Sequence, residues 1–315
     1  MRFALRARQV ACSTPEGAAE RRTLGDRMVG LGQRTVDLDG TAWGRLWRFD
    51  AMVQLGRTAE AWTELDHLGN VLARLGDAGF TWNVTRARAA LTIASGRFAE
   101  GRLLGERVRA SAPSDEVAGA GMWLQHPMQL STLTGDSFEP KYAVPPGISE
   151  LMAANSMFIH LAPWHLAHGR VVEAERAYRA LPRPDEMQTP IFLRLLFEAV
   201  RGGVAADLGD ADGCRHAYAV LAPYADLQVT TGAGIALVLG SVQHYLGVTA
   251  PDRERAVEHL RAAVRANDLA GYEPLAARSR YYLARLEPSV ELITAARETA
   301  VRLGMRPLLA ALDAL

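Results

Sequence analysis

The sequence predicts an all-α fold, an α-solenoid built from roughly six to seven helical hairpins. A glycine followed by Arg or Asp recurs at intervals of roughly 35 to 40 residues, a period typical of stacked helix pairs. Each recurrence separates two stretches with helical spacing of apolar residues, and β-branched clusters are scarce. We call the following the turn glycines: Gly56, Gly96, Gly135, Gly169 and Gly209. Gly247 stands at the next expected step.

A chain of 315 residues suits two ordinary domains or one extended array, and 49% of its residues are hydrophobic and can supply a large buried surface. With the glycine period, we expect a single helical-repeat domain over residues 1–315. The 35 basic and 35 acidic residues leave no net charge, which argues against a nucleic-acid or membrane-surface partner. No apolar run is long enough to span a bilayer, and no signal peptide is evident. Cys12 and Cys214 are too few for a disulfide framework, so we expect a cytoplasmic setting.

The N-terminal region predicts two helices. Residues 1–12 are expected to form a frayed or truncated preceding helix. Residues 13–17 then favour a helix start, because Ser or Thr caps free amides and Pro15 suits the first turn. This helix is expected to run to about Val36, and residues 37–40 (DLDG) are expected to form a turn.

From there, hairpins are expected to alternate. The second helix of a hairpin carries a small residue near the turn glycine and a larger one about a turn later, so that the paired helices can approach. The pairs are Ala61 with Leu65, Ala174 with Tyr178, Cys214 with Tyr218 and, displaced by about four residues after Gly247, Ala256 with Leu260. Gly101 and Gly105 stand at the matching positions after Gly96 and should weaken that helix.

Three segments depart from this pattern. Residues 138–148 are expected to form an irregular loop, because prolines interrupt them and leave the second helix of that repeat missing or short. Residues 229–231 (VTT) are the one β-branched cluster, and we expect it in a turn or at a helix start. Pro288 is expected to begin a helix that ends at Gly304, with a short terminal helix after it.

The sequence lacks complete motifs for catalysis or for cofactor binding. A phosphate-binding loop would have to use the only lysine, Lys141, but Pro140 replaces the second glycine and Tyr142 replaces the hydroxyl ligand. A GxSxG nucleophile elbow is absent, and Gly240-Ser241 is expected in an apolar helix, not after a strand. We therefore expect a non-enzymatic protein with no cofactor and no metal.

The densest histidine group comprises His160, His165 and His168, with Trp164 among them. On a helix His165 and His168 share a face, whereas His160 points elsewhere. A zinc site would need three or four convergent ligands with supporting carboxylates. We expect these histidines to pack or to line a groove; a metal site, or an active site hidden among them, is the alternative.

Polar residues within the apolar first helices predict a concave peptide- or protein-binding surface. Counting back from the glycines by whole turns selects Asp50, Gln54, Asn83, Arg86, Gln125, Gln129, Ser241 and His244. For any one of them, an ordinary exposed polar side chain is the simpler interpretation, since such side chains are common at surfaces.

Several short segments of the sequence resemble a known protein family. They are WGRLWRFD at 43–50, QLGR at 54–57, SGRFAE at 95–100, GRVVEA at 169–174, YLG at 245–247, AVEHLRAAV at 256–264, AAR at 295–297 and LGMRPL at 303–308. Together they resemble the tetratricopeptide-like C-terminal region of large actinobacterial ATP-binding regulators, the MalT-like proteins of LuxR type and their cyclase-linked relatives. The resemblance covers most of the chain from about residue 13.

That resemblance implies a sensing or scaffolding role in signalling or transcriptional control, exercised through a protein or peptide partner. The family also implies an upstream nucleotide-binding domain and often a C-terminal DNA-binding unit. Neither motif set is visible before Leu315, so we expect a detached or truncated arm without ATPase or DNA-binding residues. The alternative is a free-standing tetratricopeptide-like protein that binds a peptide or effector. The oligomeric state is left open.

Overall fold

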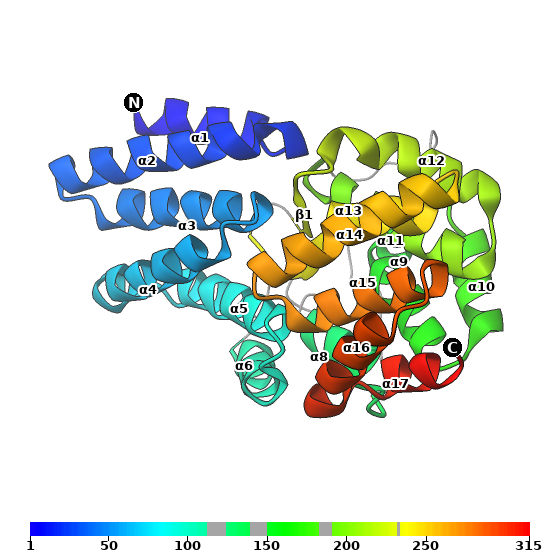
Figure 1. The fold of residues 1–315 in the computed structure, drawn as a ribbon. Helices are drawn as coiled ribbons and strands as arrows, with labels where there is room; N and C mark the ends of the chain where they lie inside the picture. Colours follow the sequence, from blue (N-terminus) through cyan, green and yellow to red (C-terminus); the bar gives the residue numbers. More distant parts are fainter. Residues whose placement is uncertain (112–123, 139–149, 183–190, 232–233) are drawn as a thin grey trace.

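The computed structural model describes residues 1–111, 124–138, 150–182, 191–231 and 234–315. It is predominantly helical, with a two-stranded antiparallel sheet in its middle, so the expected all-α class is confirmed at that level (Figure 1). Within the described ranges, no helix has the length and apolarity needed to cross a bilayer.

The helices follow one another along the chain, and most neighbours in sequence pack on one another. The N-terminal arm, which we define as α1 to α6, comprises α1 (Arg2–Ala11), η1 (Pro15–Gly17), α2 (Ala18–Thr35), α3 (Leu38–Gln54), α4 (Thr58–Leu75), α5 (Ala78–Ala94) and α6 (Phe98–Ala110). The middle of the chain comprises α8 (Gln125–Thr134), α9 (Glu150–Ala167), α10 (Val171–Arg179), η2 (Ile191–Leu193), α11 (Arg194–Leu208), α12 (Ala211–Leu221) and η3 (Ala222–Tyr224). After the sheet come α13 (Val242–Thr249), α14 (Arg253–Leu269), α15 (Glu273–Leu286), α16 (Val290–Leu303) and α17 (Arg306–Asp313).

The turn glycines end helices as the sequence predicts. All five have a positive φ, between 70° and 79°, a conformation that costs least where there is no Cβ. Gly247 was predicted to do the same, and that prediction is wrong. It lies inside α13, where an added Cβ would come within 2.5 Å of Leu260 Cγ. This glycine therefore lets α14 approach α13, and the turn follows it, before Asp252 caps α14.

Aspartates and serines begin many of the helices. Asp37 accepts a hydrogen bond from Gly40 N at 3.0 Å, and Asp77 accepts one from Phe80 N at 2.8 Å. Residues 37–40 were expected to be a turn; instead Asp37 caps α3, which begins one residue later. Ser289 caps α16 and Gly304 ends it with a φ of 68°, as predicted for that helix.

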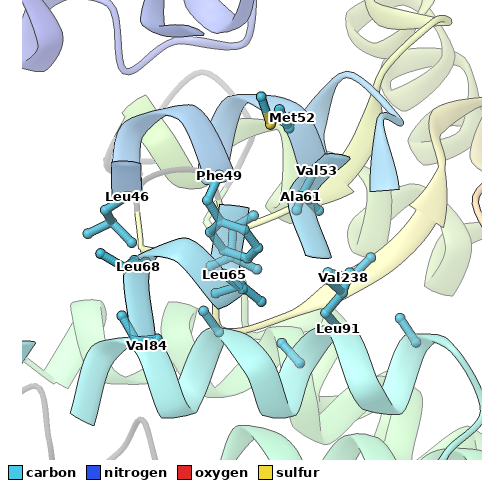
Figure 2. Packing of buried hydrophobic residues seen from close by; sticks show 14 of the residues in the cluster. Leu46, Phe49, Met52, Val53, Ala61, Leu65, Leu68, Val84, Leu91 and Val238 are labelled. Atoms are coloured by element: carbon cyan, nitrogen blue, oxygen red, sulfur yellow. The ribbon is translucent and has the colours of Figure 1, made fainter. Parts of the chain in front are cut away.

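Small residues in the second helices lie where the pairing requires them. Ala61 and Leu65 of α4 are both fully buried, in a cluster with Phe49 of α3 and Leu91 of α5. Figure 2 shows these side chains packed together, with Val238 of the sheet beside Leu91. Gly101 fits the same rule, because a Cβ there would lie 2.6 Å from Ile93 Cγ1 of α5. The glycine that should weaken α6 thus allows α6 to approach α5.

Ala174 in α10 offers a direct test of this packing. Its side chain is fully buried, and we expect Ala174→Trp to lower the free energy of unfolding by about 1–3 kcal/mol or more, because the indole cannot fit between α9 and α10 without displacing them. Chemical denaturation measures the effect. Arg176→Trp, at an exposed position two residues further along α10, is the control and should change the midpoint little. An unchanged midpoint for Ala174→Trp would contradict the pairing.

The sheet was not predicted. Residues 229–231 were expected in a turn or at a helix start, but β1 spans Gln228–Thr230 and pairs with β2, Val238–Ser241. Gly240 and Ser241 therefore lie in a strand and not in the apolar helix expected for them. Cα partners are Gln228 with Ser241 and Thr230 with Val238. We call residues 228–231 and 234–241 the central hairpin.

The central hairpin joins the two largest buried clusters. Ile235 and Val238 pack with residues of α3, α4 and α5, whereas Val229 and Leu237 pack with residues of α9, α11 and α13. Figure 1 shows β1 between the blue helices of the N-terminal arm and the yellow and orange helices that follow the sheet. The hairpin therefore packs between the N-terminal arm and the helices of the second cluster.

The last helices return to the middle of the chain. α15 contacts α5, and α17 contacts α8. Arg306 Nη2 donates to Asp136 Oδ1 at 2.9 Å, beside the turn glycine Gly135. Residues 1–12, expected to be frayed or truncated, contain α1, which buries Leu5. Most of the loop expected at 138–148 falls at positions 139–148, outside the described residues.

Candidate functional site

The predicted binding residues do not face an open groove. Asn83 and Gln125 are half-buried, and the other six are buried: Asp50, Gln54, Arg86, Gln129, Ser241 and His244. For the six buried residues, the expectation of a solvent-facing surface is corrected, because groups of the same chain cover them.

Asp50 and Arg86 hold the main chain of the central hairpin. Asp50 Oδ2 accepts from Gly234 N at 2.8 Å, and its Oδ1 accepts from Ile235 N at 3.4 Å. Arg86 Nη2 donates to Gly234 O at 3.1 Å, and Gln129 Nε2 donates to Val238 O at 2.9 Å. Side chains that bind amides and carbonyls of an extended segment are typical of peptide recognition, and here the segment belongs to the chain itself.

The remaining buried members have structural partners. Gln54 Oε1 accepts a hydrogen bond from Arg21, whose guanidinium also donates to Cys12 O at 2.9 Å. Ser241 caps α13 by accepting from Gln243 N at 3.2 Å. His244 Nδ1 lies 3.1 Å from Ser279 Oγ. These predicted binding residues therefore hold the fold together through contacts within the chain.

A cavity of about 410 Å³ lies where α8, α9, α11, α13, α15 and α17 meet the hairpin. Its volume falls within the range of small-molecule sites. Apolar side chains form most of its described wall, among them Ile159, Val204, Leu237, Leu275 and Leu308. Polar groups also reach it: Gln129, His160, Asp207, Tyr245, Arg278 and Tyr282. Of the predicted binding residues, Gln129 is the one that lines this cavity in the described structure.

The polar groups of the cavity are arranged around one arginine. Arg278 is half-buried, and its guanidinium carbon lies 5.8 Å from the centroid of the Tyr282 ring. Tyr282 donates to Asp207 Oδ1 at 2.7 Å, and Asp207 is exposed at the end of α11. Tyr245 donates to Leu239 O at 3.3 Å. The ion pairs found among the described residues do not include Arg278.

His160 does not add a second positive charge at neutral pH. Burial lowers the pKa of His160 to about 4, so its imidazole is neutral at pH 7. Arg278 is then the one cation, and Asp207 the one carboxylate, among the described residues that line the cavity. The arrangement can pair a single negative charge inside an otherwise apolar wall.

The other two histidines of the group belong to the contact between α8 and α9. His168 Nδ1 lies 2.8 Å from Trp164 O, and Trp164 Nε1 donates to Ser131 Oγ at 2.9 Å. His165 packs edge-on against the Trp164 ring. Within the part of the chain that the structure describes, no group of three or more His, Cys, Asp or Glu is placed to hold a metal ion.

Buried histidines make stability depend on pH. Burial lowers the pKa of His126 to about 3 from an ordinary 6.5, so between these values the unfolded chain binds a proton that the folded protein excludes. The folded protein is therefore most stable above pH 6.5 with respect to His126. As the pH falls below 6.5, the free energy of unfolding decreases by up to about 1.4 kcal/mol per pH unit. His160 acts in the same sense. Asp50 acts in the opposite direction. Burial raises its pKa to about 6, so its contribution to stability is full below pH 3.8 and is lost as the pH rises through 6.

We therefore expect His126→Leu to flatten the loss of stability between pH 7 and pH 5. Urea denaturation of both proteins at several pH values measures the slope. His67→Leu removes an exposed histidine of α4 and serves as the control, with the slope of the wild type. A slope for His126→Leu equal to that of the wild type would contradict the burial of a neutral imidazole.

Sequence reasoning missed most of the groups around the cavity. Arg278 and Tyr282 lie four residues apart on α15, a spacing that places them on one helix face, but the sequence does not say that this face turns inward. Asp207 comes from α11, and α11 and α15 face each other across the cavity only in the folded chain. Comparisons with protein-family models, with curated proteins and with solved structures give no match.

Proposed function

We propose that this chain is a non-enzymatic helical-repeat sensor module of a signalling or transcriptional regulator, and that the cavity binds its effector. In this proposal, the helices form a solenoid of roughly six to seven tetratricopeptide-like hairpins. The module acts in the cytoplasm and binds a protein or peptide partner. The MalT-like, LuxR-type resemblance motivates the regulatory setting. The observation that carries the proposal is the cavity of about 410 Å³, mostly apolar with a few convergent polar groups.

The position of the cavity supports a sensing role. Helices from the middle and from the end of the chain meet around it, so a ligand would favour the arrangement in which they are closed. Leu237 and Leu239 bring the central hairpin into its wall. Asp50 and Arg86 tie that hairpin to the N-terminal arm. Ligand binding would therefore stabilise the contact between the arm and the rest of the molecule.

The chemistry of the cavity favours binding over catalysis. Arg278 carries a permanent charge and cannot act as a base, and His160 is neutral at pH 7. Asp207 is exposed and accepts a hydrogen bond from Tyr282. These groups suit recognition of a ligand, and the proposal assigns the protein no reaction and no cofactor.

Gly203 offers a position from which a side chain can enter the cavity. It lines the cavity from within α11, and an added Cβ would lie 3.5 Å from Tyr245 Cε1, an ordinary contact. Gly203→Leu should remain folded and gain about 0.5–1 kcal/mol from helix propensity. Gly69→Leu, in α4 with nothing within 4 Å of its Cβ, is the matched control.

A thermal-shift screen of a chemically diverse small-molecule library against the three proteins tests the proposal. We expect compounds that raise the Tm of the wild type and of Gly69→Leu but leave Gly203→Leu unchanged. The proposal fails if no compound shifts the wild type, or if Gly203→Leu responds as the wild type does.

The alternative is a free-standing tetratricopeptide-like protein that binds a peptide or an effector. Asp50, Arg86 and Gln129 bind the chain's own central hairpin, so these residues need no separate protein partner. A protein of this kind could bind a ligand in its cavity without any further domain. Genome context separates the two. A nucleotide-binding domain encoded in the same reading frame or by a neighbouring gene favours the regulator, and its absence favours the free-standing protein.

A further inference from the structure

We propose that the cavity is selective for small monocarboxylates with an apolar body, the carboxylate paired with Arg278 and the body packed against the aliphatic wall. This inference rests on the proposed function, because it names the chemical class of the effector that the cavity would bind. The charge of Arg278, the number of charges that the cavity can accept and the apolar character of its wall together favour this class of ligand.

The guanidinium of Arg278 is positioned to receive an anion. It lines the cavity, it is always charged, and the described ion pairs do not include it. Asp207 attracts its charge and Tyr282 hydrogen-bonds with it, which leaves other N–H groups of the guanidinium able to donate to a bound carboxylate. A guanidinium binds a carboxylate through two parallel hydrogen bonds, which fixes the orientation of the ligand.

The cavity is suited to one negative charge and not to two. Asp207 lines the same space and would repel a dianion such as a phosphate monoester. His160 is neutral, so it can offer a hydrogen bond but no second positive charge. A neutral ligand would offer Arg278 no bound counter-ion, and a cation would be repelled by it. Of these classes, the monoanion is the one that the charges favour.

The wall selects an apolar body. Ile159, Val204, Leu237, Leu275 and Leu308 reach the cavity from five different elements and surround it with aliphatic surface. Burying a methylene group against such a wall contributes about 0.8 kcal/mol. A saturated medium-length chain therefore suits the cavity, and n-decanoate is a suitable probe.

Calorimetric titration of the full chain with n-decanoate, 1-decanol and n-decylamine tests the inference, since the three probes share a body and differ in head-group charge. We expect decanoate to bind at least about tenfold more tightly than decanol, and decylamine to bind more weakly than either. Arg278→Gln should remove the preference for decanoate and leave the decanol affinity within about twofold. Arg278→Lys should keep part of the preference, because it retains the charge without the planar fork.

Arg280→Gln is the matched control. Arg280 lies two residues further along α15, pairs with Asp268 at 2.6 Å and does not line the described cavity, so its loss should leave all three affinities unchanged. If Arg278→Gln does not fold, the three probes on the wild type decide: a preference for decanoate supports the inference and equal affinities overturn it.

Two further results would overturn the inference. One is decanoate binding that persists in Gly203→Leu, which would place the ligand elsewhere. The other is a preference for decanoate that Arg278→Gln leaves intact. The proposed function is tested separately. If library compounds bind the cavity but decanoate does not, only the inference about the ligand class is wrong. If the cavity binds no compound at all, the proposed function is wrong.

Discussion

Arg86→Glu is expected to lower the free energy of unfolding by about 3–5 kcal/mol at pH 7, as expected when a buried charge is left without its partners. Arg86 is 3% exposed, donates to Gly234 O at 3.1 Å and lies over the Trp82 ring. A glutamate there loses the donor to the hairpin carbonyl. It also places a second carboxylate near Asp50, whose pKa the charge of Arg86 helps to lower against the raising effect of burial.

Urea denaturation measures this cost, and the same helix supplies the control. Arg88 lies two residues further along α5, where its guanidinium pairs with the exposed Asp66 at 2.9 Å. Arg88→Glu should cost about 1 kcal/mol or less, because exposed ion pairs contribute little. Equal effects of the two substitutions would mean that Arg86 does not anchor the hairpin, and would revive its interpretation as a surface residue.

Val238→Asp is expected to be more disruptive still, with a loss of about 4 kcal/mol or more. Val238 is fully buried in the same cluster as Phe49, Leu65 and Leu91. Figure 2 shows it next to Leu91 of α5. A carboxylate at this position would be ionised only at a large desolvation cost, or neutral only through a strongly raised pKa. Val238→Ala removes volume alone and should cost about 2 kcal/mol.

Hydrogen exchange on the two Val238 variants tests whether the hairpin couples the two halves of the core. Ile235 and Val238 pack against the N-terminal arm, and Val229 and Leu237 pack against α9, α11 and α13. Val238→Asp should therefore reduce protection in α3 to α5 and in α11 and α13 together. Loss of protection confined to the arm would show that the two clusters are stable independently.

The helical hairpins could be predicted because their signals are local. A positive φ at Gly56 or Gly209 is favoured by the absence of a Cβ at that residue, whatever the distant chain does. The buried small residue Ala61 follows from the close approach of two helices that are neighbours in sequence. Gly247 shows the limit of this reasoning, because the same residue type also serves where one helix packs against another in mid-helix.

The central hairpin could not be predicted from its own residues. Residues 228–230 form a strand because they find a partner strand and two apolar clusters to fill, and strand preference depends strongly on such surroundings. The polar residues of α3 and α5 were misplaced for the same reason. Asp50 takes its hydrogen bond from Gly234, 184 residues away along the chain. A polar side chain on an apolar helix face looks exposed until such a remote partner is known.

By itself, the sequence determined the helical class of this protein and the turns that its glycines make, because those depend on backbone sterics within a few residues. Only the tertiary structure decided that the chain's own hairpin packs against α3, α4 and α5 and covers their polar side chains. It also decided that α15 and α11 turn Arg278 and Asp207 toward one cavity. These outcomes depend on the return of the last helices to the middle of the chain, where burial and pairing between distant segments outweigh local preference.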